Sequence, residues 1–444
     1  MKTILITLLI LFGTLSGICQ PVIKYPNESD PIRKKYDWVS SQKLPSGFFI
    51  GYSVTIKSKE NSNFFFGKYD SQKSKYYQSL ESIISGNPKP ATNQKELLKK
   101  EIERALEQDD ENDEDDNSKS DKIVEKEYGI LFHFYGNKAD FNEVDEIAAS
   151  YMQKGIDIDK ETIYWLGKSD PNQSVEFLMS IYNGKSSDKT KENMLSLIGI
   201  HTDSENDLPF YKKVLNDNGD NKLGKAAIFW IGQQDKTEGL EIIKSVLKQK
   251  ELRDIWDEAV FSLSQMDIKE ANEFLFDLAK NSKEREVKKK ALFWIGQKST
   301  DEAANLLKDV VYNDSNDEIQ KEAIFGISQL KKEKGTELLF EIAEKHPESE
   351  IRKQAIFWLS QKAGQKVIQF ISNAAYNDRD IEIKKQAVFA LAQLDKNEGL
   401  DELVKLAKDH PSAQIRKEAI FWLSQKDDKR ALEAIKDILK SEEN

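Results

Sequence analysis

The stretch AIFWLSQK occurs at Ala355–Lys362 and again at Ala419–Lys426, and near-copies begin at Ala227 (AIFWIGQQ) and Ala291 (ALFWIGQK). A fixed period of about 20 to 50 residues is the signature of structural repeats that stack into an elongated domain. The sequence therefore predicts a solenoid, with a regular 32-residue period from about residue 219. The leading Ala keeps this step through seven copies without an insertion, at Ala227, Ala259, Ala291, Ala323, Ala355, Ala387 and Ala419.

Each repeat is predicted to be a pair of helices. In EIRKQAIFWLSQ (350–361) the apolar residues recur with helical spacing, and the stretch contains neither Gly nor Pro. A polar break leads to a second apolar-periodic stretch, such as EGLDELVKLAKDH (398–410). The second helices end where Pro347 and Pro411 follow a His, because the residue before Pro avoids the α region.

Two degenerate copies precede the regular series, IYWLGK (163–168) and LSLIGI (195–200). We read both as repeat helices. The expected fold is then an all-α right-handed solenoid of about nine short helix pairs over residues 137–444, behind a small α+β N-terminal region.

The segments IRKQAIFWLS at Ile351 and IRKEAIFWLS at Ile415 fit the pattern [Val/Ile]-Arg-x-x-Ala-x-x-x-Leu-Gly, with Ser in place of Gly. In this the chain resembles HEAT-like repeat proteins of the phycobilisome-lyase type, over about residues 142–444. The resemblance implies an α-solenoid in a secreted bacterial HEAT-repeat protein. It implies little about chemistry, because such repeats occur both in enzymes and in binding scaffolds.

The first 19 residues predict a secretory signal peptide. One Lys precedes a long apolar run, and small residues follow at the expected cleavage site. We therefore expect an exported protein that resides in the periplasm, the outer envelope or the extracellular space. The alternative is a lipid anchor at Cys19, which the large Ile18 disfavours. Cys19 is the only cysteine, which excludes a disulfide framework, and no later stretch has the ~18 apolar residues that a membrane span needs.

Residues 20–136 predict a small α+β region that covers the first repeats. Aromatic and β-branched runs at 47–56 and 63–69 favour a hairpin, and the alternating run at 127–136 favours a third strand. A charged helix is expected at 95–108. In an alternative hypothesis, the aromatic residues between 48 and 69 carry the specific binding and the repeats only space them.

Residues 107–120 are expected to form a disordered acidic loop. Eight of the ten residues at 107–116 are acidic, and they account for most of the net charge of −11. The segment lacks the Asp-x-Asp-x-Asp-Gly spacing of a calcium loop. Because the chain has no overall basic excess, nucleic acid is excluded as the expected partner.

A Phe follows the repeat Ala by two residues in all seven copies, and a Gln follows it by six. On a helical wheel the Phe lies opposite the Ala stripe, in line with this Gln and with a residue, mostly Lys, four positions before the Phe. Large aromatics are sparse on a merely solvated face. Two interpretations stay open. The rings seal the stack of helices, with Gln bonding across repeats or to the next turn, or they form a concave groove for a protein, an extended peptide or a glycan.

The candidate binding ladder consists of one Phe, one Gln and usually one Lys from each copy. Its members are Phe229, Phe261, Phe293, Phe325, Phe357, Phe389, Phe421, Lys225, Lys289, Lys321, Lys353, Lys385, Lys417, Gln233, Gln265, Gln297, Gln329, Gln361, Gln393 and Gln425.

A Trp occurs next to the Phe in alternate copies only, and the other copies carry a small residue there. The residue four positions later compensates for the change in side-chain volume, because it is polar after a Trp and apolar after a small residue. Side chains four apart on a helix are neighbours, so we interpret the Trp as a core residue and the true unit as 64 residues. The alternating residues are Trp230, Ser262, Trp294, Gly326, Trp358, Ala390 and Trp422.

The sequence offers no catalytic constellation. Di-iron hydroxylases with HEAT-type repeats use His-Glu pairs, whereas His133, His201, His346 and His410 are followed by Phe, Thr or Pro. Nucleotide-binding, metalloprotease and nucleophile-elbow motifs are absent from the sequence. We therefore predict a non-enzymatic scaffold or adaptor of the cell envelope, with no cofactor or metal. The alternative is a lyase- or chaperone-like protein that acts on a chromophore or a client protein.

Overall fold

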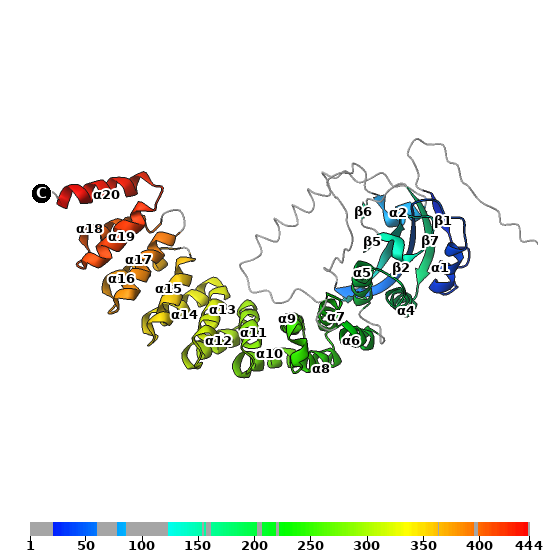
Figure 1. Cartoon of the computed structure of the whole chain (residues 1–444), viewed down its shortest axis with the longest axis horizontal. Coiled ribbons are helices and arrows are strands. Elements are labelled where there is room, and N and C mark those ends of the chain that lie inside the picture. The colour runs from blue at the N-terminus through cyan, green and yellow to red at the C-terminus, as the bar shows by residue number, and fades with distance from the viewer. Residues whose placement is uncertain are drawn as a thin grey trace, which may run out of the picture. The chain divides into compact units, whose positions relative to one another are not determined.

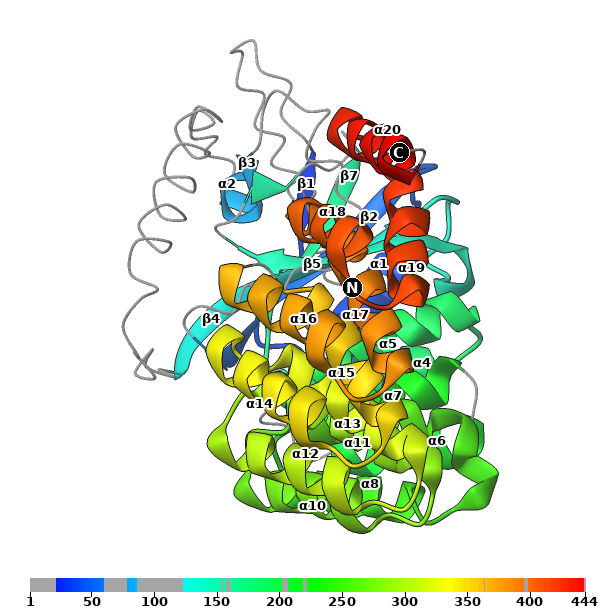
Figure 2. The same ribbon diagram turned by 90° about the vertical axis from the view of Figure 1, so that its left-hand side faces the viewer.

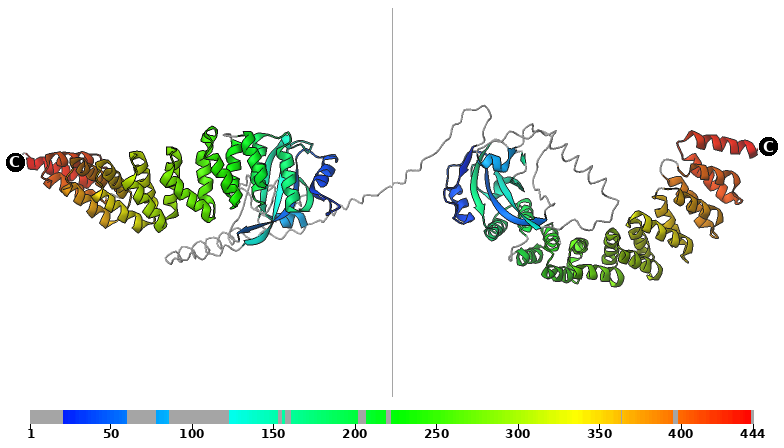
Figure 3. Two further views of the ribbon diagram at one scale, coloured as in Figure 1. Left: turned by 90° about the horizontal axis from the view of Figure 1, so that it is seen from below. Right: turned by 180° about the vertical axis from the view of Figure 1, so that it is seen from behind.

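The computed structural model describes residues 21–59, 78–85, 123–152, 155–156, 161–201, 207–218, 222–362, 364–394 and 398–442. The chain divides into two compact units, residues 1–230 and 231–444. A mixed α/β part and a series of short helices are visible in every view (Figures 1, 2 and 3).

The first unit contains a five-stranded mixed sheet with the strand order β1-β7-β2-β4-β5. β2 pairs antiparallel with β4, which places Phe48 opposite Phe134, and parallel with β7, which places Phe48 opposite Thr162. A second, two-stranded sheet pairs β3 (Gln78–Ser79) with β6 (Gly155–Ile156). The strands of the main sheet are β1 (Val22–Lys24), β2 (Phe48–Lys59), β4 (Ile123–Phe134), β5 (Val144–Tyr151) and β7 (Thr162–Ser169).

Helices cover both faces of this sheet. On one face, Phe49, Leu131 and Trp165 pack with residues of α2 (Leu80–Ser85). The other face lies under α1 (Ile32–Ser40) and α4 (Pro171–Tyr182), where Phe177 contacts the ring of Tyr52. Successive side chains of a strand point to opposite faces, so the neighbouring aromatics of β2 supply both cores.

The predicted strands at 47–56 and 127–136 are confirmed as β2 and β4, but the predicted hairpin is wrong. The antiparallel neighbour of β2 is β4, far away in sequence. The expected second hairpin arm at 63–69, the helix at 95–108, the acidic loop at 107–120 and the signal peptide at 1–19 lie outside the described residues.

The segment IYWLGK (163–168) is a strand and not the repeat helix that we predicted. It belongs to β7, which lies between β1 and β2 with helices on both sides of the sheet. A strand buried on both faces is apolar throughout, and its short run cannot be told from a helix by periodicity. The sheet therefore extends to Ser169, past the boundary that we predicted at residue 136, and one expected helix pair is removed.

The prediction that LSLIGI (195–200) lies in a helix is confirmed, because α5 spans Asp188–Gly199. α5 and α4 join the sheet through a buried hydrogen-bonded chain. His201 Nε2 is 3.0 Å from Ser174 Oγ, which is 2.8 Å from the hydroxyl of Tyr52. The first unit continues through α6 (Asp207–Asn218) into α7 (Lys222–Gly232). The sheet thus packs directly on α4 and α5.

The second unit consists of two layers of helices. One layer, here called the A layer, contains α9, α11, α13, α15, α17 and α19, each in contact with the next. The other, the B layer, contains α8, α10, α12, α14, α16, α18 and α20. Taken by itself this unit is curved, and the A layer lines its inner side (Figure 1).

The A-layer helices are α9 (Trp256–Gln265), α11 (Arg285–Lys298), α13 (Asp317–Gln329), α15 (Ser349–Ser360), α17 (Ile381–Gln393) and α19 (Ala413–Ser424). The B-layer helices are α8 (Thr237–Val246), α10 (Lys269–Asn281), α12 (Asp301–Asn313), α14 (Lys332–Lys345), α16 (Gln365–Asn377), α18 (Leu400–Asp409) and α20 (Lys429–Glu442), and a 3-10 helix η2 (Lys250–Ile255) precedes α9.

Two histidines link consecutive helices. His346 and His410 are the C-terminal caps of α14 and α18. Each Nδ1 accepts a hydrogen bond from the backbone N–H two residues later, at Glu348 and Ser412, where the next helix begins. These side chains therefore act as hydrogen-bonded corners between the end of one helix and the start of the next.

Candidate functional site: an aromatic strip on the A layer

The seven Phe rings of the candidate ladder are neither buried in the core nor free in water. Phe229 lies on α7 of the first unit, and the other six lie on the A layer of the second unit. All are half-buried except Phe421 on α19, which is 53% exposed. The repeat Ala residues behind them are fully buried, for example Ala291 and Ala355. The wheel thus assigned the two sides of each helix correctly.

In the second unit the Phe rings join the alternating Trp rings into what we call the aromatic strip. Trp358 on α15 contacts Phe325 on α13 at 4.9 Å between ring centroids, and Phe357 on its own helix at 5.1 Å. Phe293 on α11 stacks on Phe325 at 5.8 Å. The strip consists of Phe261, Phe293, Trp294, Phe325, Phe357, Trp358, Phe389, Phe421 and Trp422.

We had predicted from their alternation that the Trp residues belong to the core, and this prediction is wrong. Trp294, Trp358 and Trp422 are half-buried, and each ring fills the space between its own helix and the preceding A-layer helix. On the wheel the Trp and Phe positions are neighbours. That adjacency could have placed both rings on one surface, but volume compensation favoured an interior position.

The small residues of the other copies have a different cause, which is close contact between backbones. A Cβ built on Gly296 of α11 would lie 2.6 Å from the carbonyl oxygen of Gly326 on α13. In the corresponding joint between α15 and α17, Ser360 and Ala390 are buried. Two kinds of joint thus alternate along the A layer, one tight and one filled by Trp, which gives the 64-residue unit a geometric meaning.

One edge of the strip carries Lys residues that we predicted, and three of the six predicted Lys residues are paired with acids. Lys385 lies 2.8 Å from Glu382, Lys289 lies 3.9 Å from Glu286, and Lys353 pairs with Glu350. The partner carboxylates are more than half exposed. At these three positions the Lys charge is therefore balanced by a neighbouring carboxylate on the same helix.

The other edge carries the Gln residues, which are exposed in the six copies from Gln265 to Gln425. Gln361 Nε2 donates to the hydroxyl of the preceding Ser360, which in turn donates to the carbonyl of Phe357. The same chain recurs at Gln265, Gln329 and Gln425. In these four copies Gln thus bonds to the preceding Ser, and not across repeats or to the next turn as one of our two interpretations had it. Among the described residues nothing donates to the Oε1 atoms of these four amides, which remain available as acceptors.

A second set of Lys residues fixes the Trp-filled joints. Lys298 and Lys362, each four residues after a Trp, donate to the carbonyls of Ser264 and Ser328 on the preceding A-layer helix. Burial lowers the pKa of the Lys298 ammonium. A cation at the carboxyl end of a helix is favourable, so these contacts tie neighbouring helices together at the strip.

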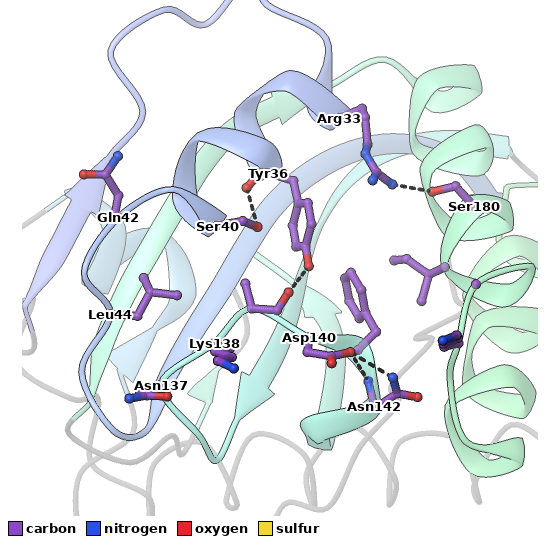
Figure 4. Close-up of a pocket in the computed structure, with 15 residues that line it drawn as sticks. Arg33, Tyr36, Ser40, Gln42, Leu44, Asn137, Lys138, Asp140, Asn142 and Ser180 are labelled. Atoms are coloured by element: carbon purple, nitrogen blue, oxygen red, sulfur yellow. Dashed lines mark hydrogen bonds between the residues drawn. The ribbon is translucent and has the colours of Figure 1, made fainter.

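The first unit contains an open pocket of about 630 Å³ between α1, the β4–β5 connection and the end of α4 (Figure 4). Its polar groups bond to one another. The Tyr36 hydroxyl donates to the Ala139 carbonyl, and Arg33 donates to Ser180 Oγ at 3.3 Å. Burial raises the pKa of Tyr36 to about 12, so its hydroxyl stays protonated. These bonds join three elements of the unit, and we assign the pocket a structural role.

Within the described ranges no three His, Cys, Asp or Glu side chains come together in a way that could hold a metal ion. In the same ranges, none of the helices combines the length and apolar character that crossing a membrane requires.

Comparison with known proteins bears on the second unit. The family described as HEAT repeats matches residues 272–360, 336–412 and 368–444. No curated protein matches the chain. Among solved structures, human deoxyhypusine hydroxylase in complex with glycerol is similar at 15% identity and a TM-score of 0.26, over 60% of this chain and 97% of the other. A lipovitellin structure is similar at 10% identity and a TM-score of 0.42, over 72% of this chain and 41% of the other.

The repeat match and the two helix layers define the class of this part of the chain, an α-solenoid. Residues 272–444 match the family described as HEAT repeats. Such solenoids generally serve as scaffolds that bind other proteins along an extended surface.

Proposed function

We propose that the protein is a non-enzymatic scaffold that binds a segment of another protein along the aromatic strip. The observation that carries this proposal is the strip itself, a run of half-buried rings along one helix layer. Aromatic side chains dominate the energetics of protein interfaces, and a half-buried ring retains apolar surface that a partner can cover. We further propose, from the signal-like N-terminus, that the protein works in the cell envelope after export.

The polar edges of the strip support a protein ligand. Exposed Gln oxygens accept hydrogen bonds from N–H donors, and a peptide backbone supplies such donors at regular intervals. The paired Lys and Glu side chains of the opposite edge impose no strong preference for ligand charge. These features suit affinity for an apolar polypeptide segment with modest sequence specificity.

The test is site-specific photocrosslinking in the cells that make the protein. A photoreactive residue replaces Gln361 at the edge of the strip, and in a parallel strain it replaces Glu337, which is exposed on α14 of the B layer. We expect crosslinks to a partner protein from position 361 and not from position 337. Equal labelling at both positions would contradict the proposal.

Ring substitutions then connect the crosslink to the strip. The triple variant Phe325→Ser, Phe357→Ser and Phe389→Ser should lose the crosslink from position 361. The matched control is Phe340→Ser with Phe370→Ser. These rings are also half-buried and in mutual contact, at 4.6 Å between centroids, but they belong to the B layer. The control should retain the crosslink, and circular dichroism should show that both variants keep their helices. A crosslink that survives in the triple variant would argue against binding at the strip.

A further inference from the structure

The aromatic strip contains three equivalent groups of rings, and the first two also touch each other where Phe293 stacks on Phe325. Each group contains a Trp, the Phe beside it on the same helix, and the Phe of the preceding A-layer helix. The contacts of each Trp with the preceding helix are the same, 4.9 Å between ring centroids in all three groups. The groups are Phe261, Phe293 and Trp294; Phe325, Phe357 and Trp358; and Phe389, Phe421 and Trp422.

The spacing of these three groups is set by the alternation of joints. Each group straddles a Trp-filled joint, and a tight joint separates it from the next group. The groups therefore repeat every two A-layer helices. Packed helices lie about 8–10 Å apart, so adjacent groups are about 16–20 Å apart.

The available hydrogen-bond acceptors indicate the conformation of the ligand. At least one Gln with a free Oε1 lies at the edge of each group: Gln265 in the first, Gln329 and Gln361 in the second, and Gln425 in the third. A helical ligand has already paired its backbone N–H groups along most of its length, whereas an extended chain still offers them. The strip therefore favours an extended polypeptide over a helix.

We propose that the strip measures spacing along its ligand: it has three equivalent subsites and takes an extended polypeptide with apolar anchor residues about six positions apart. This proposal rests on the proposed function. An extended or polyproline II chain rises about 3.1–3.4 Å per residue, so six residues span about 19–20 Å, the distance of two helix spacings. Each further anchor then binds intramolecularly, and the affinity rises without any new kind of contact.

Synthetic peptides of fixed pitch test this spacing. Three Leu anchors are placed in a background of alternating Pro and Ser, which stays extended and keeps backbone N–H donors, with a period of four, six or nine residues, which corresponds to about 12, 19 or 28 Å. The dissociation constant of each fluorescein-labelled peptide is measured with the full chain by fluorescence anisotropy. We expect the period-six peptide to bind at least tenfold more tightly than the other two. Equal dissociation constants for the three periods, or no binding of any peptide at millimolar concentration, would overturn the proposal.

Single substitutions test the equivalence of the subsites. Trp294→Ala, Trp358→Ala and Trp422→Ala should each weaken the period-six peptide by a similar factor and leave the period-four peptide within about threefold. Phe340→Ser with Phe370→Ser, on the B layer, should change neither. If one Trp variant abolishes binding and the other two have no effect, a single site replaces the three subsites and the inference fails.

The two proposals fail separately. A crosslink from position 361 together with equal affinities for all periods would keep the proposed function and reject the spacing rule. Loss of both signals would reject both.

Discussion

The substitution Gly296→Ala tests the packing that separates the ring groups. The added Cβ would lie 2.6 Å from the Gly326 carbonyl oxygen and 2.7 Å from its Cα, and both atoms are backbone. Since ordinary contacts begin near 3.4 Å, α11 and α13 would have to separate by close to 1 Å. Overpacking of this kind costs about 1–3 kcal/mol, and backbone obstacles favour the upper end of that range.

A favourable term acts in the opposite direction. Replacing Gly by Ala inside a helix stabilises it by about 1 kcal/mol, because Gly loses more backbone entropy on folding. The expected net effect of Gly296→Ala is therefore a destabilisation of about 1–2 kcal/mol. Ser360 occupies the equivalent position one 64-residue unit later and already carries a Cβ. Ser360→Ala should cost only the two hydrogen bonds of its hydroxyl, which donates to the Phe357 carbonyl and accepts from the exposed Gln361, together about 1 kcal/mol.

Urea unfolding followed by circular dichroism measures the total change for each variant. Each repeat contacts only its neighbours, so hydrogen exchange of peptides from α11 and α13, compared with peptides from α19, shows where the change occurs. We expect faster exchange in α11 and α13 alone. A higher urea midpoint for Gly296→Ala would mean that helix propensity dominates and that these backbones are not in contact, which would refute the account of the tight joint.

Two further predictions concern buried polar groups. Arg352 is 3% exposed and donates to the His346 carbonyl at 3.3 Å and to Asp378 at 3.4 Å, so Arg352→Ala should cost about 3–5 kcal/mol in urea unfolding. The half-buried Arg416 one unit later donates to carbonyls only, and Arg416→Ala should cost clearly less; equal losses would contradict this assignment. Burial lowers the pKa of His201 to about 4 from an ordinary 6.5, so the fold holds this side chain neutral. Its contribution to stability is complete above pH 6.5 and is lost as the pH falls towards 4, by up to about 3 kcal/mol. Unfolding at pH 7.5 and 5 should show this loss in the parent and a smaller one in His201→Gln, and an identical pH dependence in both would exclude His201 as its source.

Much of the fold was predictable because a regular repeat shows where each helix pair begins and ends. Seven copies in register fix the helix pairs of the second unit. The buried Ala and the opposite Phe of each A-layer helix follow from 100° per residue alone. Strands β2 and β4 were also predictable from their aromatic runs. Their pairing was not, because residues 47–56 and 63–69 suggested a local hairpin, and only tertiary structure brings β4 beside β2.

The error at IYWLGK has the same origin. Within a chain of 32-residue repeats, an apolar segment 32 residues before another one suggests a further copy. The segment is instead a central strand, apolar on both faces because α1, α2 and α4 surround the sheet. The period and the composition of the segment both agreed with a helix. Whether helices cover a sheet on both faces depends on residues far away in the sequence, so a short segment cannot show it.

The sequence predicted which residues of each helix form the candidate site, but it did not predict how their side chains form a surface. The sequence correctly placed Phe and Gln on one side of each helix, but it led us to assign Trp to the core. A large side chain that is matched by a polar residue four positions later resembles the volume compensation of a packed interior. In the structure, Lys298 and Lys362 extend past the Trp rings to carbonyls of the preceding helix. The polar residue thus holds the joint that the Trp fills. The alternation that suggested a core is the feature that gives the strip its repeating groups of rings, and the proposed spacing rule follows from that interval.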